Sequence, residues 1–135
     1  MRSRRLDGSD VVPNSLSERV IGAAIEVHRE LGPGLLESAY RICLGHEFEL
    51  RRIPYQREVS IPVKFKGLAL DCGYRLDFIV GTCLILEIKA VEELHPVHTA
   101  QLLTYLRLSD TRLGLLLNFH VPVLKQGVRR VVNNF

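Results

Sequence analysis

An acid and a lysine stand two residues apart near the end of an otherwise apolar run. The run Leu84-Ile85-Leu86-Glu87-Ile88-Lys89 is rich in leucine and isoleucine, which predicts a buried strand. Because side chains alternate along a strand, Glu87 and Lys89 are expected on one face, and Leu86 and Ile88 on the other. A carboxylate and an ammonium on a core strand are costly unless they meet a partner, a metal ion or a cleft. The pair is therefore a candidate functional site, and the alternative is a partly exposed ion pair where the strand leaves the core.

A second acid, Asp77, lies on the preceding strand-like run. If the two runs form an antiparallel hairpin in which Val80 faces Leu84, Gly81 to Cys83 make a three-residue loop, which is a common hairpin class. In that register Asp77 lies opposite Glu87. A two-residue loop would shift the register by one residue and put the two acids on opposite faces. A shared site therefore depends on the length of this loop.

A predicted helix beyond these strands carries two polar side chains one turn apart. Pro96 fits the first turn of a helix that runs to about Leu108. Within it, Gln101 and Tyr105 lie at i and i+4, on one helical face. On the sheet-facing side, these groups could line the same cleft as the two acids. The alternative is a solvated Gln101 and a Tyr105 at the rim of the core.

Together, these residues resemble the PD-(D/E)XK nuclease superfamily, and in particular its GxxExxY proteins, a family of small bacterial and archaeal proteins. The matching residues are Asp77, Glu87-Ile88-Lys89 and Gln101 to Tyr105, which resembles the motif of RecB-type members. Upstream, Gly34-Leu35-Leu36-Glu37-Ser38-Ala39-Tyr40 fits the pattern G-x-x-E-x-x-Y. The resemblance covers roughly residues 15–133, and other runs that carry it are Gly22 to His28, Leu70 to Arg75 and Lys89 to Glu92.

The resemblance implies metal-dependent hydrolysis of phosphodiester bonds in DNA or RNA. Asp77 and Glu87 would bind Mg²⁺ or Mn²⁺, with the backbone carbonyl of Ile88 as a further ligand, since Mg²⁺ prefers oxygen ligands. Lys89 would orient or deprotonate the attacking water and offset negative charge. It can act as a base only if its pKa is lowered. Leu76 stands where the superfamily's name has a proline.

The same resemblance gives supporting roles to three further residues. Glu37 would hold the water shell of the metal or a second ion, and Gln101 and Tyr105 would contact the phosphate or orient Lys89. The alternative for Glu37 is a carboxylate in the first turn of a helix, stabilised by the helix dipole. Tyr40, in the same motif as Glu37, could equally be a core residue.

Other polar residues give weaker signals. His95 and His98 have no third and fourth ligand at zinc spacing, which argues against a metal pair, but they lie where they could touch substrate. Arg51-Arg52 and Arg129-Arg130 could reach phosphates, although solvated faces are the default interpretation of such pairs.

The elements that must position these residues follow from helix and strand signals. Ser15 to Glu18 has capping-box spacing and predicts a helix to about Leu31, ended by Gly32-Pro33-Gly34. The remaining predicted elements are a helix from near Leu35 to about Arg52, an edge or bulged strand around Pro62, a turn at Lys66-Gly67, the two acid-bearing strands, the Pro96 helix, a strand from Arg112 to Phe119 and a strand from Val128 to Val132.

The fold class expected is α/β (α+β), with a mixed central β-sheet flanked by helices in the order α-α-β-β-β-α-β-β. The resemblance implies a restriction-endonuclease-like core. The length of 135 residues suggests one domain, residues 14–135, after a mobile tail of residues 1–13.

Composition constrains the function only loosely. The hydrophobic share of 47% and the charged share of 24% are ordinary for a globular protein, and no run is long enough for a membrane helix. The net charge of +3 is weak support for nucleic-acid binding. Cys43, Cys72 and Cys83 form no CxxC pair, which favours reduced thiols in a cytoplasmic protein.

Three function classes remain open at this stage. The first is the metal-dependent nuclease. The second is a catalytically weak nucleic-acid-binding module, and the third is a regulatory partner that keeps the nuclease fold with the charged cluster as a buried polar network. A small nuclease has limited surface for gripping a duplex, which favours a homodimer.

Overall fold

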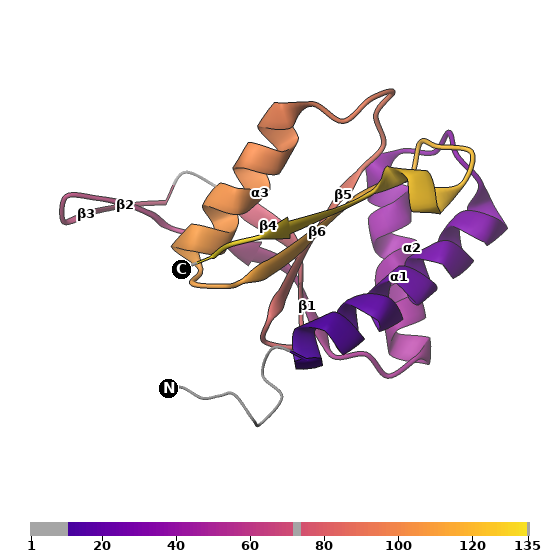
Figure 1. Cartoon of the computed structure of the whole chain (residues 1–135), viewed down its shortest axis with the longest axis horizontal. Coiled ribbons are helices and arrows are strands. Elements are labelled where there is room, and N and C mark those ends of the chain that lie inside the picture. Colours follow the sequence, from indigo (N-terminus) through magenta and orange to yellow (C-terminus); the bar gives the residue numbers. More distant parts are fainter. Residues whose placement is uncertain (1–10, 72–73, 135) are drawn as a thin grey trace.

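The computed structural model describes residues 11–71 and 74–134, and its centre is a five-stranded mixed sheet (Figure 1). The strand order is β1-β4-β5-β6-β7, in which β5 and β6 are parallel and the other neighbours are antiparallel. The predicted mixed sheet is therefore confirmed. Its strands are β1 (Tyr55–Ser60), β4 (Arg75–Val80), β5 (Leu84–Lys89), β6 (Leu113–Asn118) and β7 (Val128–Val132).

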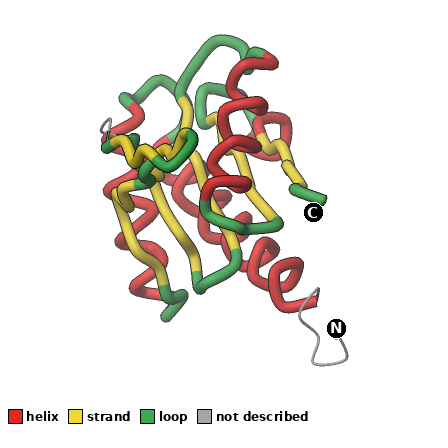
Figure 2. Tube along the Cα trace, turned by 90° about the vertical axis from the view of Figure 1, so that its left-hand side faces the viewer, coloured by secondary structure: helices red, strands yellow, loops and turns green. Residues whose placement is uncertain are grey.

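Helices cover both faces of this sheet. Helices α1 (Val11–Leu31) and α2 (Glu37–Leu50) lie on one side, and α3 (Pro96–Leu108) lies on the other (Figures 1 and 2). Strand β5 contributes to both layers, since Leu86 packs in the α1/α2 cluster and Ile85 in the α3 cluster. A strand buried on both faces must be apolar almost throughout, which explains the leucine-rich runs of β5 and β6. Among the described residues, no helix is long and apolar enough to cross a membrane.

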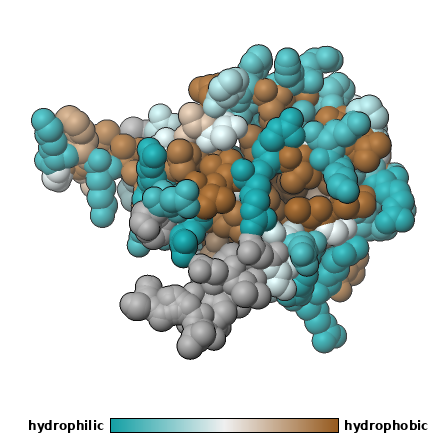
Figure 3. Space-filling view, viewed as in Figure 1, coloured by the Kyte–Doolittle hydropathy of each residue, from teal (hydrophilic) through white to brown (hydrophobic). Residues whose placement is uncertain are grey.

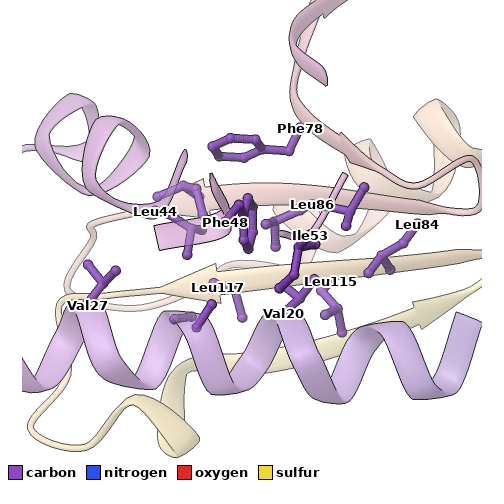
Figure 4. Packing of buried hydrophobic residues seen from close by; sticks show 14 of the residues in the cluster. Val20, Val27, Leu44, Phe48, Ile53, Phe78, Leu84, Leu86, Leu115 and Leu117 are labelled. Atoms are coloured by element: carbon purple, nitrogen blue, oxygen red, sulfur yellow. The ribbon is translucent and has the colours of Figure 1, made fainter. Parts of the chain in front are cut away.

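The larger core cluster fills the space between the sheet and helices α1 and α2. Figure 4 shows Val20 of α1 close to Leu115 of β6 within this cluster. Phe48 of α2 meets Phe78 of β4 nearly edge to face, with ring centroids 5.4 Å apart. These contacts hold α2 against β4, so the start of α2 has a fixed place beside the strand that carries Asp77.

Helix α1 begins earlier than the sequence predicts. It starts at Val11, so Ser15 lies inside the helix and the predicted capping box is wrong. Residues 11–13 of the predicted tail are helical, and residues 1–10 lie outside the described residues. Pro13 is compatible with this start because the first turn of a helix has N–H groups without intrahelical acceptors. The predicted end of the helix is confirmed, and Gly32 and Gly34 follow it with φ of 70° and 103°.

Two more strands than predicted precede α3. Strands β2 (Val63–Phe65) and β3 (Leu68–Leu70) form a separate hairpin that projects from the body, and Figure 3 shows hydrophobic and hydrophilic residues along it. Pro62 separates β2 from β1, since proline cannot donate to a strand ladder. Lys66 and Gly67 form the predicted turn, with φ of 47° and 87°, as a tight hairpin requires.

Candidate active site

The hairpin of β4 and β5 has the register that the sequence predicts. Val80 pairs with Leu84 and Phe78 pairs with Leu86, which leaves Gly81 to Cys83 as the loop. Gly81 has a φ of 59°, a conformation that glycine adopts without strain. Backbone pairing of the two strands ends at Phe78 and Leu86, one position short of the two acids.

The two acids replace the missing rungs of the ladder with their side chains. The N–H of Asp77 donates to Oε2 of Glu87 at 2.9 Å, and the N–H of Ile88 donates to Oδ2 of Asp77 at 2.7 Å. Each carboxylate therefore satisfies a backbone donor on the opposite strand, which a buried N–H group requires. The strands separate where the acids lie, and the acids hold the separated ends together.

Strand β4 also changes face at Asp77. Leu76 packs in the α3 cluster, whereas Phe78 packs in the α1/α2 cluster, although residues two apart on a regular strand share a face. On the neighbouring strand β1, Glu58 lies at the same level and has a φ of 52°, in the left-handed region. Asp77 thus occupies a local kink at which the regular alternation of side chains along β4 is interrupted.

Burial perturbs both carboxyl groups, and at Glu87 the charge of Asp77 adds to it. Glu87 is 8% exposed. Burial, followed by the charge of Asp77, raises the pKa of Glu87 from 4.5 to about 8. Burial also raises the pKa of Asp77. Lys89 and Arg41 act in the opposite direction on both groups, so a positive charge at this place stabilises the ionised pair.

Helix α2 brings a third acid and an unforeseen cation to the site. Glu37 is the first residue of α2, and Oε1 of Glu37 lies 3.3 Å from Nη1 of Arg41, one turn further along. The same nitrogen lies 3.7 Å from Oδ1 of Asp77. Arg41 therefore links Glu37 to the hairpin. Arg41 was not predicted from the sequence, although its i,i+4 spacing from Glu37 was a usable signal.

Tyr40 positions this helix and is a core residue, the alternative that the sequence left open. Its hydroxyl donates to the carbonyl of Gly32 at 2.5 Å and accepts from the N–H of Leu35 at 3.2 Å. Its ring stacks on Phe119, with centroids 4.5 Å apart. Tyr40 therefore fixes the turn that immediately precedes Glu37, which gives the G-x-x-E-x-x-Y spacing a structural meaning.

Lys89 ends β5 on the same face of the strand as Glu87. Within the described part of the chain, its ammonium group makes no hydrogen bond or ion pair, and the side chain is half-buried. The chain beyond it is held by Asn118 of β6, whose amide accepts from the N–H of Val91 at 3.0 Å and donates to the carbonyl of Val91 at 2.9 Å. Asn118 was not identified from the sequence, because its role depends on pairing between distant segments.

Helix α3 brings Tyr105 close to the acids and leaves Gln101 at the surface. Tyr105 is buried, its ring lies 6.5 Å from that of Tyr74, and burial and the charge of Glu87 raise its pKa. Gln101 is exposed and, within the described residues, makes no hydrogen bond to any of the predicted site residues. The two hairpin acids thus meet, Lys89 lies within electrostatic range of both, Tyr105 borders them, and Glu37 reaches them through Arg41.

These residues suit a magnesium-type ion better than a transition metal. Among residues 11–71 and 74–134, no three His, Cys, Asp or Glu side chains cluster tightly enough to hold a metal by themselves. Mg²⁺ does not require such a cage, since one or two carboxylates with water and substrate phosphate complete its shell. Oε2 of Glu87 is occupied by the N–H of Asp77, whereas Oε1 has no donor within the described residues. A buried carboxylate oxygen without a partner, beside a second carboxylate, fits a hard cation.

Comparison with known proteins agrees with this geometry. A family model described as PD-(D/E)XK nuclease superfamily matches residues 14–131, and the chain therefore belongs to that superfamily. No curated protein and no solved structure matches the chain.

Proposed function

We propose that this member of the PD-(D/E)XK nuclease superfamily is a metal-dependent nuclease that hydrolyses phosphodiester bonds in DNA or RNA. The observation that carries the proposal is the opened end of the β4–β5 hairpin, where the carboxylates of Glu87 and Asp77 accept hydrogen bonds from the backbone N–H groups of Asp77 and Ile88. A purely structural hairpin end has no need of two partly desolvated carboxylates, since ordinary backbone pairing satisfies the same donors at lower electrostatic cost.

The roles follow from the positions of the side chains. Asp77 and Glu87, with the backbone carbonyl of Ile88, are the proposed metal ligands, and Glu37 holds the water shell or a second ion. A bound Mg²⁺ or Mn²⁺ would polarise the phosphate and lower the pKa of a coordinated water. Lys89 orients the attacking water and offsets the charge that develops on the phosphate. Tyr105 limits access of bulk water beside Glu87, and Gln101, exposed on α3, contacts the substrate backbone.

The finer assignments are proposals of the same kind. We assign the chain to the GxxExxY proteins on Gly34, Glu37 and Tyr40. We also propose residues 14–135 as one domain and a homodimer as the working form, since two sites would address two strands. A cytoplasmic location is supported by Cys43 and Cys83, which are free thiols in the described chain. Cys72, the third cysteine, lies outside the described residues.

Metal binding and cleavage can be tested in two successive experiments. Calorimetric titration of Mn²⁺ into the wild type, Asp77→Asn and Glu87→Gln comes first, with Glu18→Gln as a control that removes an exposed carboxylate from α1. The same proteins are then incubated with single- and double-stranded DNA and RNA oligonucleotides, with Mg²⁺ or Mn²⁺ and with EDTA. We expect binding and cleavage in the wild type and the control, and a loss of cleavage of about a hundredfold or more in the two site variants.

The outcomes separate the three function classes. Cleavage by Asp77→Asn or Glu87→Gln at the wild-type rate would rule out the proposed site. Salt-sensitive binding of oligonucleotides without metal-dependent cleavage would favour the nucleic-acid-binding module. Absence of metal binding, nucleic-acid binding and cleavage in the wild type would favour the regulatory partner.

A further inference from the structure

His98, in the first turn of α3, has one ring nitrogen committed to the backbone. The N–H of His95 donates to Nδ1 of His98 at 3.1 Å. A backbone N–H can only donate, so Nδ1 is the acceptor and carries no proton. The neutral ring must then hold its proton on Nε2, and this nitrogen is a hydrogen-bond donor in a fixed tautomer.

His98 lies on the stripe of α3 that leads to the candidate active site. His98, Gln101 and Tyr105 lie at i, i+3 and i+7, so they form one stripe along α3. Tyr105, at the far end of the stripe, packs beside the strands that carry the acids. His98 is half-buried at the near end, in electrostatic range of Lys89 and Glu37.

The ring is also kept neutral where it lies. Burial, and then the charges of Lys89 and His95, lower the pKa of His98, while Glu37 acts in the opposite direction. No described residue accepts a hydrogen bond from Nε2 of His98, and the bond from the N–H of His95 uses only Nδ1. A half-buried donor without an acceptor, at the edge of a site rich in charge, is suited to a ligand that brings its own acceptor.

We infer that His98 is a further substrate-binding residue, whose Nε2–H donates a hydrogen bond to a non-bridging oxygen of a substrate phosphate. The inference rests on the proposed nuclease function and adds a binding residue that the motifs did not include. The backbone bond from His95 orients the ring before the substrate arrives, so little rotamer entropy is lost on binding.

A double-mutant cycle between the protein and the substrate tests this contact. The wild type, His98→Ala and His98→Gln are assayed with the oligonucleotide that the wild type cleaves, and with versions that carry a single neutral methylphosphonate at successive positions. His98→Gln is the matched control, because its amide offers both an acceptor for the N–H of His95 and a donor. Circular dichroism melting of all three proteins records any loss of the helix cap.

We expect His98→Ala to lower kcat/KM about tenfold or more with the unmodified oligonucleotide. At one phosphate position, the methylphosphonate should cost the wild type a similar factor and His98→Ala almost nothing further, because that contact is already lost. His98→Gln should keep most of the sensitivity at this position. A residue that only caps the helix would give additive losses at every position.

The result distinguishes the inference from the function on which it rests. A wild type that cleaves its oligonucleotide, with additive losses at every phosphate or with wild-type kcat/KM for His98→Ala, would overturn the role of His98 alone. A wild type that cleaves no oligonucleotide in the first experiment would overturn the proposed function, whatever His98 does.

Discussion

The two ends of the β4–β5 hairpin are built from the same strands but held together by different forces. At the loop end, Val80 pairs with Leu84 through regular backbone bonds, and both side chains are fully buried in the α1/α2 cluster. At the open end, Asp77 and Glu87 take over the backbone donors with their carboxylates. The loop end is stabilised by apolar burial, which does not depend on pH, whereas the open end depends on charge.

This difference indicates how a stable fold can support an unfavourable site. Partly desolvated carboxylates destabilise the chain unless a cation or a proton compensates them. The large core that holds β4 and β5 on the other face of the sheet tolerates that cost. The two ends should therefore respond differently to substitution, pH and metal ions, and each of these treatments tests the comparison.

Phe78→Ala should give the largest loss of stability. Phe78 is fully buried and its ring lies 5.4 Å from Phe48 and 5.8 Å from Tyr55, so truncation leaves a cavity and removes two aromatic contacts. We expect the free energy of unfolding to fall by about 3–5 kcal/mol in urea denaturation. Mn²⁺ affinity, measured at low temperature where the variant is folded, should stay within a few-fold of the wild type. Phe78→Leu, a milder control, should lose less stability, and a large loss of metal binding in either variant would mean that the apolar core and the open end are coupled.

Glu87 should make the metal-free protein less stable as the pH rises, which is the opposite of the effect of a carboxyl group whose pKa is lowered by folding. Its pKa is about 8 in the folded state and 4.5 in the reference state, so between these values the folded chain binds more protons than the unfolded chain. The contribution of Glu87 to the free energy of unfolding in EDTA should therefore be fully present below about pH 4.5. It should be lost as the pH rises toward 8, and the loss should be on the order of a few kcal/mol. The raised pKa of Asp77 acts in the same direction.

Urea denaturation of the wild type and Glu87→Gln across this pH range measures the effect. The glutamine has no titrating group, so its stability should depend less on pH, with only the part due to Asp77 remaining. Glu18→Gln should follow the wild type. Equal pH dependence of stability in the wild type and Glu87→Gln between pH 5 and pH 8 would show that burial does not keep Glu87 protonated.

Gly81→Ala tests the loop end on a smaller scale. Gly81 has a φ of 59°, and a Cβ atom at this position would meet Cδ2 of Leu16 at 3.0 Å. We expect a loss of about 1–2 kcal/mol from the left-handed conformation alone, read from urea denaturation. Gly81→Asn is the matched control, since asparagine tolerates this φ better and adds the same Cβ. Equal losses in the two variants would assign the cost to the contact with Leu16 rather than to the backbone.

Local patterns in the sequence predicted the parts of the molecule that depend on neighbouring residues. The bounds of α3 follow from Pro96 and its apolar periodicity, and the structure has the predicted helix from Pro96 to Leu108. The register of β4 and β5 follows from the length of one loop, and it is confirmed by the pairing of Val80 with Leu84. The face shared by Glu87 and Lys89 follows from the alternation of β5.

Features that depend on distant segments could not be predicted in the same way. The kink of β4 at Asp77 lies opposite Glu58 of β1, which has a left-handed backbone, and strict alternation would have put Leu76 and Phe78 on one face. The cation beside Asp77 comes from α2, and the bonds that hold the separated strand ends together are donated by backbone N–H groups to carboxylates of the opposite strand. Apolar periodicity contains no information on such bonds.

Arg41→Gln should have the smallest effect on stability, but it should change the affinity for the metal ion. Its guanidinium lies between Glu37 and Asp77, but it is about one-third exposed, so its loss should cost less than about 1 kcal/mol in urea denaturation. A positive charge 3.7 Å from Oδ1 of Asp77 also repels a cation bound to that carboxylate. Removing it should tighten Mn²⁺ binding by about several-fold in calorimetric titration at low salt. Arg41→Lys retains the charge and should bind Mn²⁺ with an affinity close to that of the wild type. Weaker binding by Arg41→Gln would instead mean that Arg41 holds the Asp77 carboxylate in place, and the open end would then need this cation for its geometry as well as for its charge balance.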